Sequence, residues 1–189
     1  MKSERRNPLP VARLTYHINR SPSGRHSARP ARRWATYFAF GRDREAMADG
    51  RQRGQWYGPE GRQHSHKEVL EWAESQAKEF RYTWQALLSV PEGRLTPADF
   101  TQALQAGGLI EEWRLVVHDD TDYSHAHVLF FRDRRLDREQ FTRWHDRVRD
   151  ELAALEARHL GDRAPQQEAA MPGSEAQQAE RSTAWEAEL

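Results

Sequence analysis

Two apolar runs separated by a short polar segment place the strongest constraint on how this chain folds. The runs are residues 113–117 and 128–131, and residues 118–127 lie between them. Runs of β-branched and aromatic residues on either side of a turn-forming segment predict a β-hairpin. The two runs are therefore expected to lie side by side as neighbouring strands of one sheet.

Three histidines stand in this hairpin at positions that would bring them together. His125 and His127 are two residues apart, so both side chains face the same side of a strand. His118 returns beside them from the partner strand. Because convergent imidazoles are typical ligands of divalent metal ions, the spacing predicts a metal site formed by these three residues.

A second His-x-His sequence in the chain has a simpler interpretation. His64 and His66 flank Ser65, and Glu68 follows three residues after the serine. A serine followed three residues later by glutamate is the capping box that begins a helix. We therefore interpret Ser65 as a helix N-cap and expect no metal at His64 and His66.

Helical and β-type segments alternate along the rest of the chain. Helices are expected from Ser65, from Thr96–Pro97 and from Asp137, and strands at residues 82–90 and in the hairpin. Residues 11–20 are interpreted as a short amphipathic helix and residues 34–40 as a strand. This order predicts the α+β class, a two-layer sandwich with a mainly antiparallel sheet and helices on one face. Residues 1–160 would form this domain, and residues 161–189 a disordered acidic tail.

Composition limits the class of protein further. Seven tryptophans and seven phenylalanines in 189 residues are enough for a packed core. The absence of cysteine excludes disulfides, thiolate zinc sites and a cysteine nucleophile. Since no apolar stretch is long enough for a membrane span or a signal peptide, we expect a cytoplasmic protein with no membrane partner.

The net charge of zero hides an asymmetry. Up to His66 the chain has fourteen basic and five acidic residues, and the remainder is acidic to the same extent. Thirteen of these basic residues are arginines, which pair with phosphate oxygens and stack on bases. Aromatic residues such as Tyr37 and Tyr57 lie among them, as a surface for single-stranded nucleic acid requires. The first third of the chain is therefore a candidate nucleic-acid-binding region, with a solvated basic surface as the alternative.

The histidine segment resembles the third motif of DNA relaxases, the HUH-type mobilisation nucleases of plasmids and integrative elements. That motif has a histidine, an acidic residue two positions later, and a His-x-His pair seven and nine positions later. His118, Asp120, His125 and His127 match all four positions. The resemblance covers about residues 11–160.

Two upstream segments resemble the other relaxase motifs. Residues 16–20 are similar to the first motif, which carries a tyrosine nucleophile and ends in an arginine, here Arg20. Residues 87–93 are similar to the second motif, a strand that ends in a serine, here Ser89, before a Pro-acidic-Gly turn. The three motifs occur in the same order as in the family.

The resemblance implies a site-specific single-strand DNA endonuclease for plasmid or integrative-element mobilisation. Such an enzyme nicks a transfer origin by metal-assisted transesterification and remains linked to DNA through a 5′-phosphotyrosine. The implied metal is Mg²⁺ or Mn²⁺, with Zn²⁺ as the alternative. The implied partners are single-stranded or locally melted DNA, accessory transfer-origin proteins and a coupling protein.

The resemblance and the basic region together assign roles to individual residues. Tyr16 is the expected nucleophile. Asp120 is expected to orient a ligand imidazole or to assist the tyrosine. The expected DNA contacts are Arg20, Arg32, Arg33, Tyr37 and Ser89.

Three other functions remain open from the sequence. The first is a non-catalytic relaxase-like DNA-binding protein. The second is a replication initiator or transposase, although in those proteins the tyrosine usually follows the histidines, and no tyrosine follows Tyr123 here. The third is a hydrolytic metallophosphoesterase, which would leave no covalent adduct.

Overall fold

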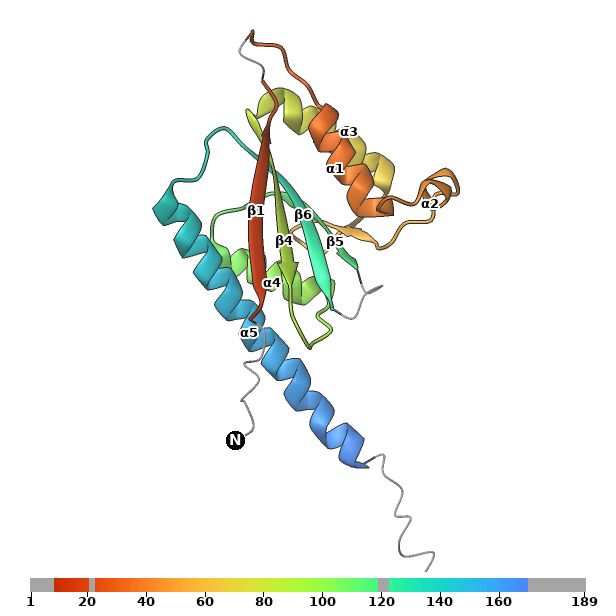
Figure 1. Ribbon diagram of the computed structural model, residues 1–189, viewed down its shortest axis with the longest axis vertical. Helices are drawn as coiled ribbons and strands as arrows, with labels where there is room; N and C mark the ends of the chain where they lie inside the picture. The colour runs from red at the N-terminus through yellow and green to blue at the C-terminus, as the bar shows by residue number, and fades with distance from the viewer. Residues whose placement is uncertain (1–8, 21–22, 119–122, 170–189) are drawn as a thin grey trace, which may run out of the picture.

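A six-stranded antiparallel sheet forms the centre of the computed structural model, which describes residues 9–20, 23–118 and 123–169 (Figure 1). The order of strands across the sheet is β1-β4-β6-β5-β2-β3, and each neighbouring pair is antiparallel. The strands are β1 Val11–Ile18, β2 Trp56–Tyr57, β3 Gln63–His64, β4 Tyr82–Ser89, β5 Trp113–His118 and β6 His125–Arg132. The predicted hairpin is β5 and β6, paired directly with each other.

Helices cover both faces of this sheet (Figure 1). The helices are α1 Arg29–Phe40, α2 Arg44–Ala48, α3 His66–Glu79, α4 Pro97–Gly107 and α5 Arg138–Ala169. The α+β class and the antiparallel sheet are confirmed. The helices expected from Ser65, Thr96 and Asp137 do not all lie on one face: α4 and α5 cover one face, and α3 lies with α1 on the opposite face.

Alternation along β6 separates two hydrophobic cores. Ala126, Val128 and Phe130 point to the face covered by α4 and α5, which we call the α5 face. Leu129 and Phe131 point to the face covered by α1 and α3, which we call the α1 face. Because successive side chains of a strand project to opposite sides, the odd-numbered residues of β6, including His125 and His127, belong to the α1 face.

Helix starts follow the predicted capping residues closely. Ser65 accepts a hydrogen bond from the backbone of Glu68, and the Glu68 carboxylate accepts one from the Ser65 backbone. Thr96 and Asp99 form the same reciprocal pair at α4. These side chains satisfy backbone N–H groups that have no partner within the helix, so the sequence marks the helix starts correctly.

The first forty residues differ from the sequence interpretation. Residues 11–18 form an edge strand rather than a helix, because Ala12 and Leu14 pack on the α5 face while the residues between them face the other side. The segment interpreted as a strand belongs to α1, in which Ala31, Ala35 and Phe38 recur at helical spacing and are buried. At the other end, α5 continues to Ala169, so residues 161–169 are helical rather than disordered.

Within the described residues, every helix is too short or too polar to cross a membrane.

We predict that Gly107→Ala destabilises the fold. A Cβ at Gly107 on α4 would lie 2.6 Å from Cδ1 of Trp144 on α5. Overpacking of this kind costs about 1–3 kcal/mol. Urea unfolding should show this loss as a lower free energy of unfolding. The matched control is Gly161→Ala on α5, where an added Cβ meets nothing within 4 Å, and which should be neutral or stabilising by up to about 1 kcal/mol. Equal effects of the two changes would contradict the close packing.

Candidate metal centre

Strand register brings the predicted metal ligands to one place. His118 on β5 is directly opposite His125 on β6. On the other side of β6, Ser89 pairs with His125 and Leu87 pairs with His127. Directly paired residues of antiparallel strands project to the same face, so all five side chains lie on the α1 face.

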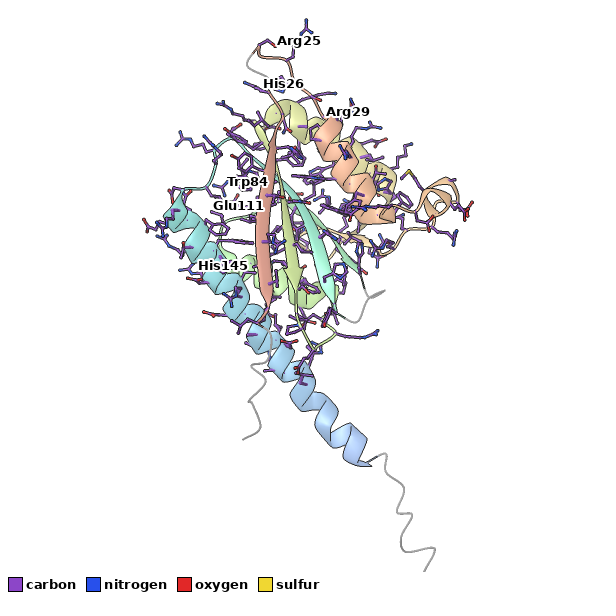
Figure 2. The ribbon with its side chains drawn as sticks, in the orientation of Figure 1. Arg25, His26, Arg29, Trp84, Glu111 and His145 are labelled. Atoms are coloured by element: carbon purple, nitrogen blue, oxygen red, sulfur yellow. The ribbon has the colours of Figure 1, made fainter. Side chains whose placement is uncertain are left out.

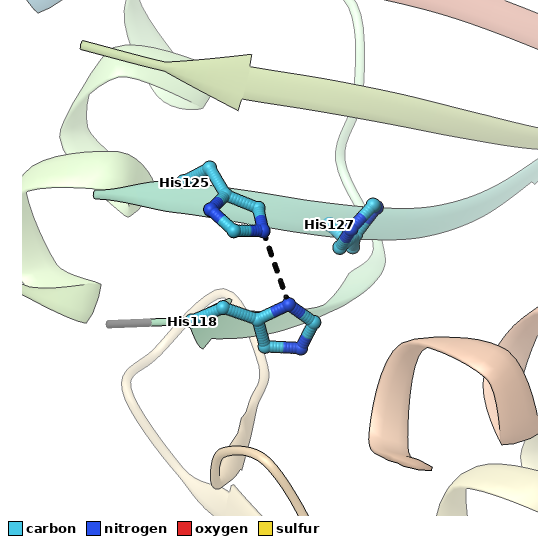
Figure 3. Close-up of side chains that lie close together, drawn as sticks. All are labelled: His118, His125 and His127. Atoms are coloured by element: carbon cyan, nitrogen blue, oxygen red, sulfur yellow. Dashed lines mark hydrogen bonds between the residues drawn. The ribbon is translucent and has the colours of Figure 1, made fainter. Parts of the chain in front are cut away.

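The three imidazoles lie close enough together that they could hold a single ion. Each offers one nitrogen, and these nitrogens lie within 4.8 Å of one another (Figure 3). His118 Nδ1 is 3.2 Å from His125 Nε2. Two nitrogens at about 2.1 Å from one ion would be about 3.0 Å apart at a right angle and about 3.4 Å apart at a tetrahedral angle. The observed separation lies between these values, so it suits two ligands of one metal ion.

Hydrogen bonds on the outer side of the rings fix which nitrogens face the cluster. His118 Nε2 donates to the Phe38 carbonyl at 2.7 Å, and His125 Nδ1 lies 3.3 Å from the Tyr123 carbonyl. A carbonyl can only accept, so each of these nitrogens carries the proton. In the neutral rings, His118 Nδ1 and His125 Nε2 then direct lone pairs at the same point. A cation shared by these two nitrogens would stabilise this arrangement.

His127 is held in its neutral form. Its ring stacks on Phe38 with 4.5 Å between ring centroids. Burial, followed by the charges of His118, His125 and Arg53, lowers the pKa of His127 from 6.5 to about 3. Metal ligation requires an unprotonated imidazole, so this ring is ready to bind an ion at neutral pH without first losing a proton.

Helix α1 is attached to the cluster through Phe38. This residue accepts the His118 hydrogen bond with its carbonyl and stacks on His127 with its ring. The preceding residue, Tyr37, is 42% exposed, and its ring lies edge-on to His127 with 6.3 Å between centroids. The structure therefore brings Tyr37 to the edge of the three-histidine cluster.

Tyr16 lies on the opposite face of the sheet. It pairs with Trp84 and packs on Trp84 and Tyr82, on the α5 face. Its hydroxyl accepts a hydrogen bond from Arg135 Nη1 at 3.1 Å. The structure therefore does not bring Tyr16, the expected nucleophile, to the histidine cluster, because the thickness of the sheet separates its hydroxyl from the histidines. Alternation along β1 sends Tyr16 to one face and His17 to the other.

The other predicted residues are distributed around the α1 face. Ser89 lies beside His125, and its hydroxyl donates to the Ser124 carbonyl at 3.4 Å. Arg33 is exposed on α1, while Arg32 pairs with Glu74 of α3 at 2.7 Å. Arg20 lies farther away, in a β-bridge with His26 at the end of the molecule where Figure 2 labels Arg25, His26 and Arg29. Asp120 lies outside the described residues.

Tyr37 was predicted to contact DNA by stacking, and its position beside the metal cluster was missed. The cause was the interpretation of residues 34–40 as a strand. A helical signal was present, because Pro30 is followed by small or aromatic residues at positions 31, 35, 38 and 39. In a helix, positions 31, 35, 38 and 39 form the buried face, and Tyr37 lies beside that face rather than within it.

Comparisons with protein-family models, with curated proteins and with solved structures find no match for this chain.

We predict that a divalent transition ion stabilises the protein through His125. An ion at one hundred times its Kd, bound only to the folded state, adds about 2.7 kcal/mol to the free energy of unfolding. For a domain of this size that corresponds to a rise of about 5–10 °C in Tm. Thermal unfolding of metal-free protein with added Mn²⁺ or Zn²⁺ should show this rise.

His125→Gln should abolish the metal-dependent rise in Tm. The matched control is His145→Gln on α5, a histidine that stacks on Phe141 away from the cluster (Figure 2), and it should keep the full rise. A rise of wild-type size in His125→Gln would show that the ion binds elsewhere.

The low pKa of His127 predicts acid sensitivity of the metal-free protein. The unfolded state takes up this proton near pH 6.5, whereas the folded state does so only near pH 3. The free energy of unfolding should therefore fall as the pH drops below about 6.5. In His127→Gln, urea unfolding at about pH 7 and about pH 5.5 should show a smaller fall. The lowered pKa values of His64 and His66 act in the same direction and remain. An unchanged fall in the variant would contradict the assignment.

Proposed function

We propose that this chain is a metal-dependent DNA-nicking enzyme of the relaxase type, with Tyr37 as its nucleophile. One observation carries the proposal: an exposed tyrosine lies at the edge of three imidazoles that each present one nitrogen to a common point. Attack on a phosphodiester needs a nucleophile and a group that stabilises charge on the phosphate. A tyrosine beside a metal site of neutral ligands can supply both. The resemblance of the histidine segment to the third relaxase motif supports the same reaction.

The reaction exchanges one phosphate ester for another. The Tyr37 oxygen forms a bond to phosphorus while the bond between phosphorus and the 3′ oxygen breaks. The tyrosine hydroxyl gives up its proton, and the departing 3′ oxygen takes up a proton. DNA downstream of the nick stays attached to Tyr37 through its 5′ phosphate, and the reverse reaction rejoins the strand.

The metal site suits the role of Lewis acid. An ion held by His118, His125 and His127 would polarise a non-bridging oxygen of the scissile phosphate. Three neutral ligands leave the full charge of the ion to act on the phosphate. Imidazole suits Zn²⁺ and similar transition ions better than Mg²⁺, which prefers oxygen ligands. We therefore place Mn²⁺ and Zn²⁺ ahead of Mg²⁺ for this site.

Charge around the site suits a DNA strand. Arg29 and Arg33 precede Tyr37 on α1 at intervals of four residues, so the three side chains follow one line on the helix surface. Both arginines are exposed, which leaves them available to phosphates. Nicking of a transfer origin, with accessory proteins and a coupling protein, is the biological setting that the relaxase resemblance suggests.

We predict that Tyr37→Phe abolishes a covalent protein–DNA adduct. The protein is incubated with Mn²⁺ and a random-sequence pool of single-stranded DNA, and adducts are isolated after denaturation in SDS. Wild type should retain DNA labelled at the 3′ end and release DNA labelled at the 5′ end. Tyr37→Phe removes only the attacking oxygen, so adduct formation should fall at least about a thousandfold. Sequencing the retained DNA would give the nicked site.

Tyr16→Phe is the matched control, since it removes a hydroxyl on the opposite face of the sheet and should keep the adduct. An adduct that persists in Tyr37→Phe would reject Tyr37 as nucleophile. Free cleaved fragments without an adduct would favour the hydrolytic metallophosphoesterase. Binding without cleavage by wild type under any metal would favour the non-catalytic DNA-binding protein.

A further inference from the structure

A second pocket adjoins the metal centre, between strand β1 and helix α1. It has a volume of about 650 Å³, and its lining includes His17 from β1 and Trp34 and Tyr37 from α1. Tyr37 is thus shared: its ring borders this pocket and also contacts His127. The pocket therefore adjoins the proposed site of nicking at Tyr37.

Two aromatic rings form one wall of this pocket. His17 and Trp34 lie 4.5 Å apart between centroids, with their planes inclined by 41°. Trp34 is half-buried and packs against the core of the α1 face, which holds its ring in position. A fixed aromatic surface of this kind is what an unstacked nucleobase binds, because every base presents a π face.

The rim of the pocket is basic. Arg29, Arg33 and Arg42 all contribute to its lining, and the lining residues, all of them within the described ranges, include no carboxylate. Among the described residues none of these three arginines forms an ion pair, whereas their neighbour Arg32 is paired with Glu74. Three guanidinium groups around an aromatic wall are complementary to a nucleotide: the phosphate would lie at the rim of the pocket and the base inside it.

The sheet between the pocket and the metal centre is open. On the α1 face of β1, Arg13, Thr15 and His17 are exposed, and beside them on β4 Gln85 and Leu87 are only half-buried. Arg13 stands in the same row across the sheet as His127. His17 is four residues from Arg13, which is about 13 Å along a strand. A chain of nucleotides can follow this surface from one site to the other.

We propose that this pocket binds one base of a single-stranded DNA substrate, close to the scissile phosphate. The base stacks on Trp34 and His17, and the arginines hold the flanking phosphates. This proposal rests on the proposed nicking function, which supplies the DNA substrate. It adds the site at which the enzyme would recognise the strand as single-stranded. A base in a duplex is stacked and paired, so it cannot enter a pocket of this kind.

The test separates base stacking from phosphate binding. Two fluorescent twenty-nucleotide probes are compared by anisotropy with the full chain: oligo-deoxythymidine, and the same phosphodiester backbone with abasic residues throughout. Stacking of one base contributes a factor of about 5 to 150 in affinity. Wild type should therefore prefer the thymidine probe by a factor in this range.

Trp34→Ala should remove most of that preference and leave the affinity for the abasic probe unchanged. Arg33→Gln should lower the affinity for both probes by the same factor, because Arg33 would contact phosphate, which both probes contain. The matched control is Trp72→Ala. Trp72 is a half-buried tryptophan on α3 in the same core, away from the pocket, where it packs on Phe131 and Arg114. This change should preserve the preference for bases.

Loss of the preference in Trp34→Ala and its retention in Trp72→Ala would support the pocket. An unchanged preference in Trp34→Ala, or equal binding of both probes by wild type, would overturn it. Should Trp34→Ala fail to fold, His17→Ala replaces an exposed side chain and should reduce the preference in the same way. Because no cleavage is measured, the result is independent of the adduct experiment with Tyr37→Phe.

Discussion

One hydrogen bond joins the two parts of the molecule that the proposed chemistry needs together. His118 Nε2 donates to the Phe38 carbonyl at 2.7 Å, with His118 fully buried. A buried donor without a partner is costly, so this bond fixes the distance between the end of β5 and helix α1. It also determines the tautomer of His118 and directs Nδ1 toward His125. The arrangement of the metal ligands and the position of Tyr37 both depend on it.

Strand alternation determines which side chains can share the site. Every residue of β1, β4, β5 or β6 faces one side of the sheet or the other, and a change of one position in sequence reverses the face. His118, His125, His127 and Ser89 share the α1 face through their register. Tyr16 falls on the other face together with Trp84. No rotation of a side chain can carry a group through a packed sheet, so residue parity alone places Tyr16 on the face opposite the histidines.

Local signals explain why the second half of the fold was predictable. Capping residues such as Ser65 and Thr96 act within a single helical turn, and the strands of the histidine hairpin are close in sequence. The cluster of three histidines followed from the same local spacing. The first forty residues offer weaker local signals: β1 pairs with β4 some seventy residues later, and α1 begins with a proline but without a side-chain cap. Their structure is set by distant partners, and with it the position of Tyr37.

The two faces of the sheet differ in how completely helices cover them. The α5 face contains the larger hydrophobic core and the close contact of Gly107 with Trp144. On the α1 face, α1 and α3 cover β6 and leave β1 and β4 partly open. Side chains of β1 project to one face or the other, and Tyr16 projects to the α5 face. Tyr37 on α1 instead lies at the edge of the three histidines and also borders the pocket lined by His17 of β1. The incomplete helical layer therefore leaves exposed surface next to Tyr37, and the proposed function assigns this surface to DNA.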